Sequence, residues 1–254
     1  MSKNFELMQD VQIRLGTPAM GASRPVSTQV DGKANGKRKA IPFNFEEVSR
    51  EETTKLVQNI FLLRREESPR VVAFAGIDSG NGCSCICAQV AEILASQRIG
   101  SVCLVDANLR SPSLPELFGV SNHFGLTDAL SKNGPIRDFT KVVRSDNLWL
   151  LSSGSLAAGS PNLLNSETMK ERAAELRKEF DYVLIDLPPM NTCSDGVAVG
   201  QLADGLVLVL EANSTRRGAA VKVTEDLRAA QIRILAAVLN RRTFPIPEFL
   251  YNRL

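Results

Sequence analysis

The sequence predicts an α/β fold with a doubly wound, mostly parallel β-sheet and helices on both of its faces. Short apolar runs of the kind that form buried strands occur at residues 71–75, 102–105, 148–151, 182–185, 206–210 and 234–239. The runs are nearly continuous rather than alternating, as expected for strands that are covered on both faces. Between them, apolar residues recur at helical spacing, as at Ile86, Val90 and Leu94. Strands that alternate with helices favour right-handed crossovers and a parallel sheet.

The alternating pattern spans residues 46–243, which we expect to form one domain, opening with a helix from 46 to about 65. Residues 1–45 are predicted to be a flexible tail or linker, because residues 16–40 are rich in Gly, Ser, Pro and Lys and lack large apolar side chains. An apolar helical face between residues 5 and 15 is the alternative for the first part of this tail. Residues 244–254 are predicted to be a short C-terminal tail.

Composition and charge exclude several classes of function. The formal net charge of the 254-residue chain is only +2, so we expect no nucleic-acid partner. No run of eighteen apolar residues predicts a membrane span, and the amphipathic N-terminus does not look like a secretory signal. Five cysteines, an odd number, favour a reducing cytoplasm over a disulfide framework. A basic cluster at residues 33–39 predicts either a solvated linker or contact with an anionic membrane surface.

A glycine-rich loop follows the first predicted strand and leads into a helix. A phosphate-binding loop uses glycines and a helix N-terminus to surround phosphate, a lysine for the outer phosphates, and a Ser or Thr hydroxyl for Mg²⁺. The glycines, the helix and the hydroxyl of Ser84 are present, but Cys83 stands at the lysine position. A tight turn without a ligand is the alternative interpretation. The residues predicted to bind nucleotide here are Ser79, Gly80, Asn81, Gly82, Cys83, Ser84 and Cys85.

Two aspartates end predicted strands at the same edge of the sheet. Asp106 follows the run at 102–105, and Asp186 follows the run at 182–185. A carboxylate at the tip of an apolar strand is costly unless it meets a cation or hydrogen-bond donors. Capping of the following helix explains either aspartate alone, whereas Mg²⁺ bound to a phosphate explains both together with the loop. We therefore predict Ser84, Asp106 and Asp186 as metal ligands.

The three cysteines of this region have an alternative role. Cys83, Cys85 and Cys87 fall at the start of the predicted helix, where the helix dipole is expected to lower a thiol pKa. Cys83 and Cys87 share a helical face and Cys85 points away, so the three cannot bind one metal ion. Small residues that fill a tight turn are the favoured interpretation, and a redox or iron–sulfur role is the alternative.

Several stretches, taken together, resemble one protein family. Residues 106–119, DANLRSPSLPELFG, resemble the second acidic motif of the bacterial tyrosine kinases (BY-kinases) of capsule and exopolysaccharide synthesis. Similar matches, in the order and at the spacing of that family, lie within 122–126, 154–162, 182–189, 194–195, 203–205 and 238–240. More distantly, the chain is similar to the P-loop ATPases of the partition and septum-site type. Those ATPases carry an extra lysine early in the loop, where Asp78 stands here.

The resemblance implies a cytoplasmic domain, peripheral on the inner face of the membrane, that binds MgATP or MgADP and phosphorylates tyrosines. It implies a membrane polysaccharide co-polymerase, or chain-length adaptor, as the partner, contacted at its cytoplasmic end, and assembly into a homo-oligomer. In this family pattern Asp106 would be the catalytic residue, Asp186 would hold the metal through water, and Asn240, in the loop after the last strand, would contact the base.

The sequence also departs from the family pattern. The lysine is Cys83, the second carboxylate of the Asp-x-Asp motif is Asn108, and the usual proline and glutamate of the loop are Ser79 and Asn81. The Glu-x-x-Arg-x-x-Arg oligomer motif keeps only Glu51, and the tyrosine-rich tail keeps only Tyr251. We therefore predict a catalytically impaired regulator of exopolysaccharide or capsule synthesis. The alternatives are an active, divergent tyrosine kinase or ATPase that needs a partner, and a nucleotide-free scaffold.

Overall fold

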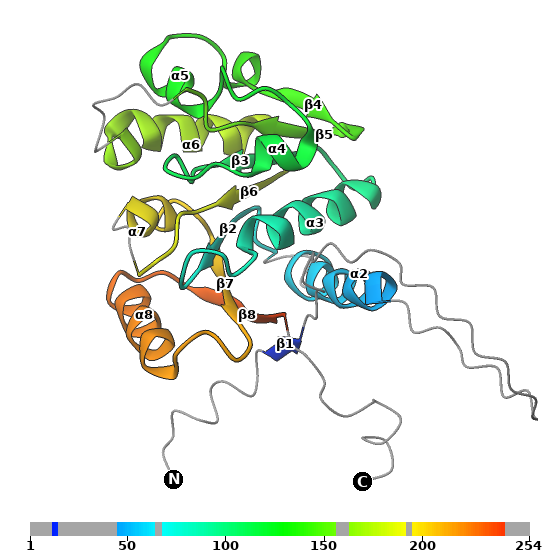
Figure 1. Cartoon of the computed structure of the whole chain (residues 1–254). Helices are drawn as coiled ribbons and strands as arrows, with labels where there is room; N and C mark the ends of the chain where they lie inside the picture. Colours follow the sequence, from blue (N-terminus) through cyan, green and yellow to red (C-terminus); the bar gives the residue numbers. More distant parts are fainter. Residues whose placement is uncertain (1–11, 15–44, 64–67, 156–162, 192–194, 242–254) are drawn as a thin grey trace, which may run out of the picture.

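The computed structural model of the chain describes residues 12–14, 45–63, 68–155, 163–191 and 195–241 (Figure 1). The basic cluster at 33–39, the C-terminal residues 242–254 and most of the apolar stretch at 5–15 lie outside these ranges. The expected domain limits at 46 and 243 therefore stay predictions.

In the described ranges, one sheet of eight strands forms the centre of the molecule, in the order β1-β8-β7-β2-β6-β3-β5-β4. All neighbours are parallel except β4 and β5, which are antiparallel. The predicted doubly wound, mostly parallel fold is thus confirmed. The strands are β1 (Gln12–Arg14), β2 (Val71–Gly76), β3 (Val102–Asp106), β4 (Lys141–Val143), β5 (Ser145–Leu151), β6 (Tyr182–Asp186), β7 (Gly205–Glu211) and β8 (Ile234–Asn240).

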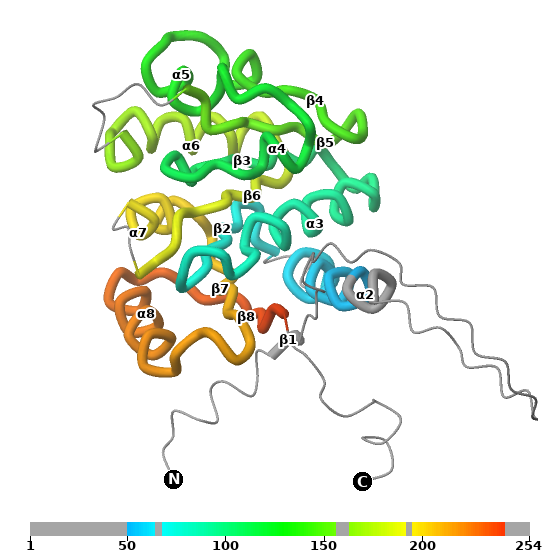
Figure 2. Tube along the Cα trace, in the orientation of Figure 1, coloured from blue at the N-terminus to red at the C-terminus, as the bar shows by residue number. Residues whose placement is uncertain are grey.

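Helices cover both faces of this sheet, as Figures 1 and 2 show. One face carries α2 (Phe45–Val57), which continues as the π-helical turn Gln58–Leu62, α3 (Cys83–Ser96) and α4 (Leu114–Phe118). The opposite face carries α5 (Leu126–Ser131), α6 (Glu167–Glu179), α7 (Asp195–Gly200) and α8 (Arg217–Ala229). Short 3-10 helices occur at Ile136–Phe139 and Leu163–Asn165. Within the described ranges, no helix is both long and apolar enough to cross a bilayer.

The strands are apolar on both sides because the core has two layers. Along β2, Val72 and Phe74 pack under α2 and α3, whereas Val71 and Ala73 pack under the helices of the other face. Every residue of β2 is buried. A strand buried on both faces needs apolar residues at successive positions, which explains the continuous runs in the sequence.

Two strands were not foreseen. Gln12–Arg14 lies within the expected N-terminal tail but forms β1, which pairs in parallel with Ala237, Val238 and Leu239 of β8. Without β1, β8 would be an edge strand with unpaired backbone N–H and C=O groups, and β1 pairs with these groups. At the opposite edge, β4 has only three residues and pairs with β5 through an irregular register.

The strand order places three loops side by side. β2 pairs with β6, and β6 pairs with β3, so the carboxyl ends of these strands meet at one edge of the sheet. The glycine-rich loop follows β2, and Asp186 and Asp106 end the other two strands. Ligands of doubly wound sheets bind at this edge, beyond the strand ends.

Candidate functional site

The glycine-rich loop joins β2 to α3 through two left-handed glycines. Gly80 has a φ of 83° and Gly82 a φ of 80°, a region that residues with a Cβ rarely adopt. At Gly82 the constraint is also steric, because a Cβ there would collide with the side-chain amide nitrogen of Asn240. The carbonyl of Gly82 accepts the first helical hydrogen bond, from the amide of Ile86 at 3.1 Å. The loop therefore leads directly into a helix N-terminus, whose amides suit an anion.

Asn81 braces this loop from within. Its Oδ1 accepts a hydrogen bond from the amide of Asp78 at 2.6 Å, and its Nδ2 donates to Oγ1 of Thr215 at 3.4 Å. Its carbonyl oxygen accepts from Nδ2 of Asn240 at 2.8 Å. Asn81 is buried, so its side chain fixes the shape of the predicted phosphate-binding loop and ties it to the ends of β7 and β8.

The three predicted metal ligands lie together. Asp106 and Asp186 are register partners on β3 and β6, and neither is exposed to solvent. The hydroxyl of Ser84, in the first turn of α3, donates to Oδ2 of Asp186 at 2.5 Å. The carboxylate of Asp106 accepts the backbone amides of Asn108 and Leu114, each at 3.2 Å.

The two carboxyl groups are electrostatically unsatisfied. Burial, with the charge of Asp186 next, raises the pKa of Asp106 to about 7. Burial also raises the pKa of Asp186 to about 6, although side-chain hydrogen bonds from Ser84 and Cys83 lower it. Within the described part of the chain, Oδ1 of Asp186 is a buried oxygen without a hydrogen-bond partner. Two buried acids and an unpartnered oxygen at a helix N-terminus are an environment that a cation would stabilise.

The donor set fits Mg²⁺ held jointly with a nucleotide. Mg²⁺ prefers oxygen ligands, and it is usually bound by one or two carboxylates together with phosphate oxygens and water. No group of three His, Cys, Asp or Glu side chains among the described residues could hold a metal ion. Ser84, Asp106 and Asp186 would therefore hold the ion only with phosphate oxygens completing its shell.

Cys83 begins α3 at the position of the expected lysine. Burial, followed by the negative charge of Asp186, raises the pKa of the Cys83 thiol well above its usual value. The pKa of Cys87 is raised in the same way. The expectation that the helix dipole lowers these pKa values is wrong, because burial and the nearby carboxylate outweigh the dipole. The thiol is thus neutral and brings no positive charge to the loop.

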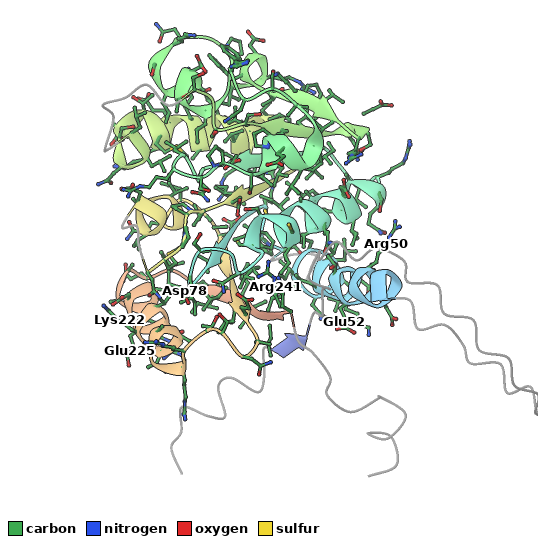
Figure 3. The ribbon with its side chains drawn as sticks, in the orientation of Figure 1. Arg50, Glu52, Asp78, Lys222, Glu225 and Arg241 are labelled. Atoms are coloured by element: carbon green, nitrogen blue, oxygen red, sulfur yellow. The ribbon has the colours of Figure 1, made fainter. Side chains whose placement is uncertain are left out.

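The end of β8 lies against the loop. Asn240, expected in the loop after the last strand, is instead the last residue of β8 and is buried. Its Oδ1 accepts the backbone amide of Arg241 at 2.8 Å. The Arg241 side chain pairs with Glu211, the last residue of β7, at 3.0 Å between Nη1 and Oε1. Figure 3 labels Arg241 and also Asp78, which lies in the loop before α3.

Sequence reasoning missed Arg241, Glu211 and Thr215 as neighbours of the loop. Glu211, the last residue of β7, and Thr215, in the turn after β7, reach the site only through tertiary structure. No local sequence pattern therefore indicates them. Arg241 left a weak signal, since it is a basic residue directly after Asn240. Asp78, at the place of the extra lysine in the more distant relatives, accepts a hydrogen bond from Nδ2 of Asn191 at 2.7 Å.

Comparison with known proteins agrees with this geometry. A family model of the ParA group, described as the NUBPL iron-transfer P-loop NTPase, matches residues 69–249. Among curated proteins, tyrosine-protein kinase YwqD of Bacillus subtilis is 34% identical over 161 residues, covering 63% of this chain and 68% of YwqD.

Solved structures show the same fold. The VpsO kinase domain is 28% identical, with a TM-score of 0.68, and the match covers 78% of this chain and 99% of that domain. The chimerical protein CapA2B2 is 23% identical, with a TM-score of 0.72, and the match covers 81% of this chain and 88% of the chimera. At 23% identity, the similarity to CapA2B2 concerns the fold alone.

Proposed function

This chain belongs to the bacterial tyrosine-protein kinases, within the ParA group of P-loop NTPases, and we propose its function from that membership. The chain is a nucleotide-binding member that has lost most of the kinase activity of its relatives. It acts as a regulator of exopolysaccharide or capsule synthesis, at the cytoplasmic face of the membrane. Its partner is the cytoplasmic end of a membrane polysaccharide co-polymerase.

Retained nucleotide binding is supported above all by Oδ1 of Asp186, which is buried and has no hydrogen-bond partner among the described residues. A buried acceptor without a partner costs about 1–3 kcal/mol, so it is expected where a ligand completes the site. Ser84 already contacts the other oxygen of the same carboxylate. A scaffold without nucleotide would gain stability by replacing these groups with apolar residues, yet the chain keeps them.

Loss of catalysis is supported by the chemistry of Cys83. Phosphoryl transfer depends on positioned positive charge, and a single arginine can be worth about 10³–10⁵ in rate. The Cys83 thiol supplies none, because its pKa is raised by burial and by Asp186. The affinity for nucleotide is reduced much less than the rate of phosphoryl transfer. One charge-assisted hydrogen bond contributes about 1.5–3 kcal/mol, or roughly ten- to hundredfold in affinity. Weak MgADP binding with little turnover follows.

The residues expected to support a homo-oligomer are also mostly absent from this chain. Glu51, the residue kept from the expected oligomer motif, pairs with Lys55 one turn away on α2, at 3.2 Å. Both side chains are exposed, so the pair contributes little to the stability of the helix. The positions of the two motif arginines hold Thr54 and Val57. We infer that homo-oligomers, if the partner induces them, use other contacts.

An active enzyme is the second candidate, and Asp106 favours it. Its pKa, raised to about 7 by burial and by Asp186, suits a general base that accepts the proton of a tyrosine hydroxyl. In that case a partner or a second copy of the chain supplies the missing cation. Activity would then depend on the partner and disappear in Asp106→Ala.

Incubation with MgATP separates the two candidates. The purified chain is incubated alone and with the cytoplasmic segments of the membrane partner, and phosphotyrosine is measured by mass spectrometry. The proposed function predicts no phosphotyrosine in either sample. Phosphotyrosine that forms with wild type and is lost in Asp106→Ala would overturn the impaired-regulator proposal in favour of the active enzyme.

A further inference from the structure

Arg241 has an unusual backbone conformation beside the glycine-rich loop. Its φ is +54°, in the left-handed region that residues other than glycine rarely adopt. Such conformations cost about 1–3 kcal/mol and gather at functional sites. Here the conformation follows directly after Asn240, where β8 ends.

Hydrogen bonds fix Arg241 relative to the loop. Asn240 donates to the carbonyl of Asn81 at 2.8 Å, and its Oδ1 accepts the amide of Arg241 at 2.8 Å. The same Asn240 side chain lies so close to Gly82 that a Cβ there would collide with it. The backbone of Arg241 is therefore connected to the N-terminus of α3 through one buried side chain.

Arg241 follows Asn240, the residue that contacts Asn81 and Gly82, so its side chain starts beside the first turn of α3. Cys85 is the third residue of α3, so its backbone amide is one of those left without a helical partner. A cation at this place and the helix amides attract the same anion.

The ion pair of Arg241 leaves part of its guanidinium group available to a ligand. Its ion pair with Glu211 uses Nη1, one of several donors of a guanidinium, and 44% of the Arg241 side chain is exposed. Arg110, which follows β3, has a 67% exposed side chain and lies 3.6 Å from Asp195 of α7. Of these two arginines, Arg241 is the one connected to the loop, through the side chain of Asn240.

We propose that Arg241 is a nucleotide-binding residue whose guanidinium donates to a phosphate of the ligand at the N-terminus of α3. It supplies there the positive charge that Cys83 does not. Arginine suits this task because its planar donors match phosphate oxygens. Glu211 holds the guanidinium in place before the ligand arrives and competes with the phosphate for it. This inference rests on the proposed nucleotide binding.

Titration calorimetry with MgADP tests the assignment on five proteins: wild type, Arg241→Ala, Arg241→Lys, Glu211→Gln and Arg228→Ala. Arg228 is an exposed arginine in the last turn of α8 and controls for the change in net charge. We expect Arg241→Ala to weaken binding about tenfold or more and Arg241→Lys to weaken it less. Arg228→Ala should bind like wild type. Glu211→Gln should bind more tightly, because the competing carboxylate is gone.

The outcomes distinguish this inference from the proposed function. If wild type and Arg228→Ala bind no nucleotide, the proposed nucleotide binding fails and the inference with it. If wild type binds and Arg241→Ala binds equally well, the inference alone is overturned. If the Arg241–Glu211 ion pair has only a structural role, Glu211→Gln and Arg241→Ala should weaken MgADP binding equally. That result also contradicts the inference. Magnesium pyrophosphate, which has no base, serves as a second probe, and a loss with MgADP alone would overturn the assignment to phosphate.

Discussion

The hydroxyl of Ser84 donates a hydrogen bond of 2.5 Å to Oδ2 of Asp186, joining the first turn of α3 to the end of β6. Ser84 and Asp186 lie 102 positions apart in the sequence, yet both were predicted as ligands of one metal ion. The other oxygen of Asp186 is buried without a partner among the described residues. A cation bound here, as proposed, would meet both oxygens of this carboxylate.

Replacing Asp186 by Asn should stabilise the protein in the absence of ligand. Asn keeps an acceptor for Ser84 and removes a buried charge whose pKa is raised from 3.8 to about 6 by burial. At about 1.36 kcal/mol per pKa unit, the gain has an upper limit of roughly 3 kcal/mol. Thermal unfolding at pH 8 with a chelator should show a Tm higher by several degrees, at about 2–4 °C per kcal/mol. A lower Tm would mean that the carboxylate stabilises the fold.

The stability gain of Asp186→Asn over wild type should increase as pH rises. Burial raises the pKa of Asp106 to about 7 and that of Asp186 to about 6, so the folded state binds more protons than the unfolded state between about pH 4 and 7. Wild-type stability from this pair is therefore highest at low pH and falls as pH rises through that window. The advantage of Asp186→Asn should be largest at pH 8 and shrink by pH 5. An advantage that stays constant or grows toward pH 5 would refute this sign.

Two glycines of the loop offer a matched pair of substitutions. Gly80 and Gly82 are both left-handed, but a Cβ at Gly80 meets nothing within 4 Å, whereas one at Gly82 collides with the Asn240 amide. Gly80→Ala should cost only the strain of the backbone, about 1 kcal/mol. Gly82→Ala should cost clearly more and also abolish MgADP binding. Urea unfolding of both variants measures the difference, and equal losses would show that Asn240 does not constrain the loop.

Cysteine reactivity tests the electrostatics of the α3 N-terminus. Burial and the charge of Asp186 raise the pKa values of Cys83 and Cys87, so neither thiol is a thiolate at neutral pH. We expect both to resist iodoacetamide in the native protein at pH 7.5 and to react after unfolding, as followed by peptide mass spectrometry. Rapid alkylation of native Cys83 would indicate the thiolate that the helix dipole alone would favour.

The sequence predicted the central strands because burial on both faces leaves a simple signal. Each of the six apolar runs became a strand, extended by one to three residues at its ends. The edge strands left no such signal. β4 has one buried residue of three, and β1 pairs with a strand more than 200 positions away. Short edge strands are set by the partner they meet, not by their own composition.

The site was predictable to the extent that its residues end strands or begin a helix. Ser84, Asp106 and Asp186 follow this rule, and the structure brings them together. The thiol pKa values were predicted with the wrong direction, because Asp186 is distant in sequence and its burial is a tertiary effect. Glu211 and Arg241 were missed for the same reason, since their pairing joins the ends of β7 and β8.

Calorimetry of MgADP binding to wild type, Cys83→Lys and Cys83→Ala tests whether the chain retains a nucleotide site that Cys83 weakens. Cys83→Lys restores the charge, and Cys83→Ala removes the thiol without adding one. We predict weak binding by wild type and Cys83→Ala, and binding roughly ten- to hundredfold tighter by Cys83→Lys. If none of the three proteins binds, the loop does not serve as a nucleotide site. If they bind but Cys83→Lys binds no better than Cys83→Ala, Cys83 is not what weakens the site; either result contradicts the proposal.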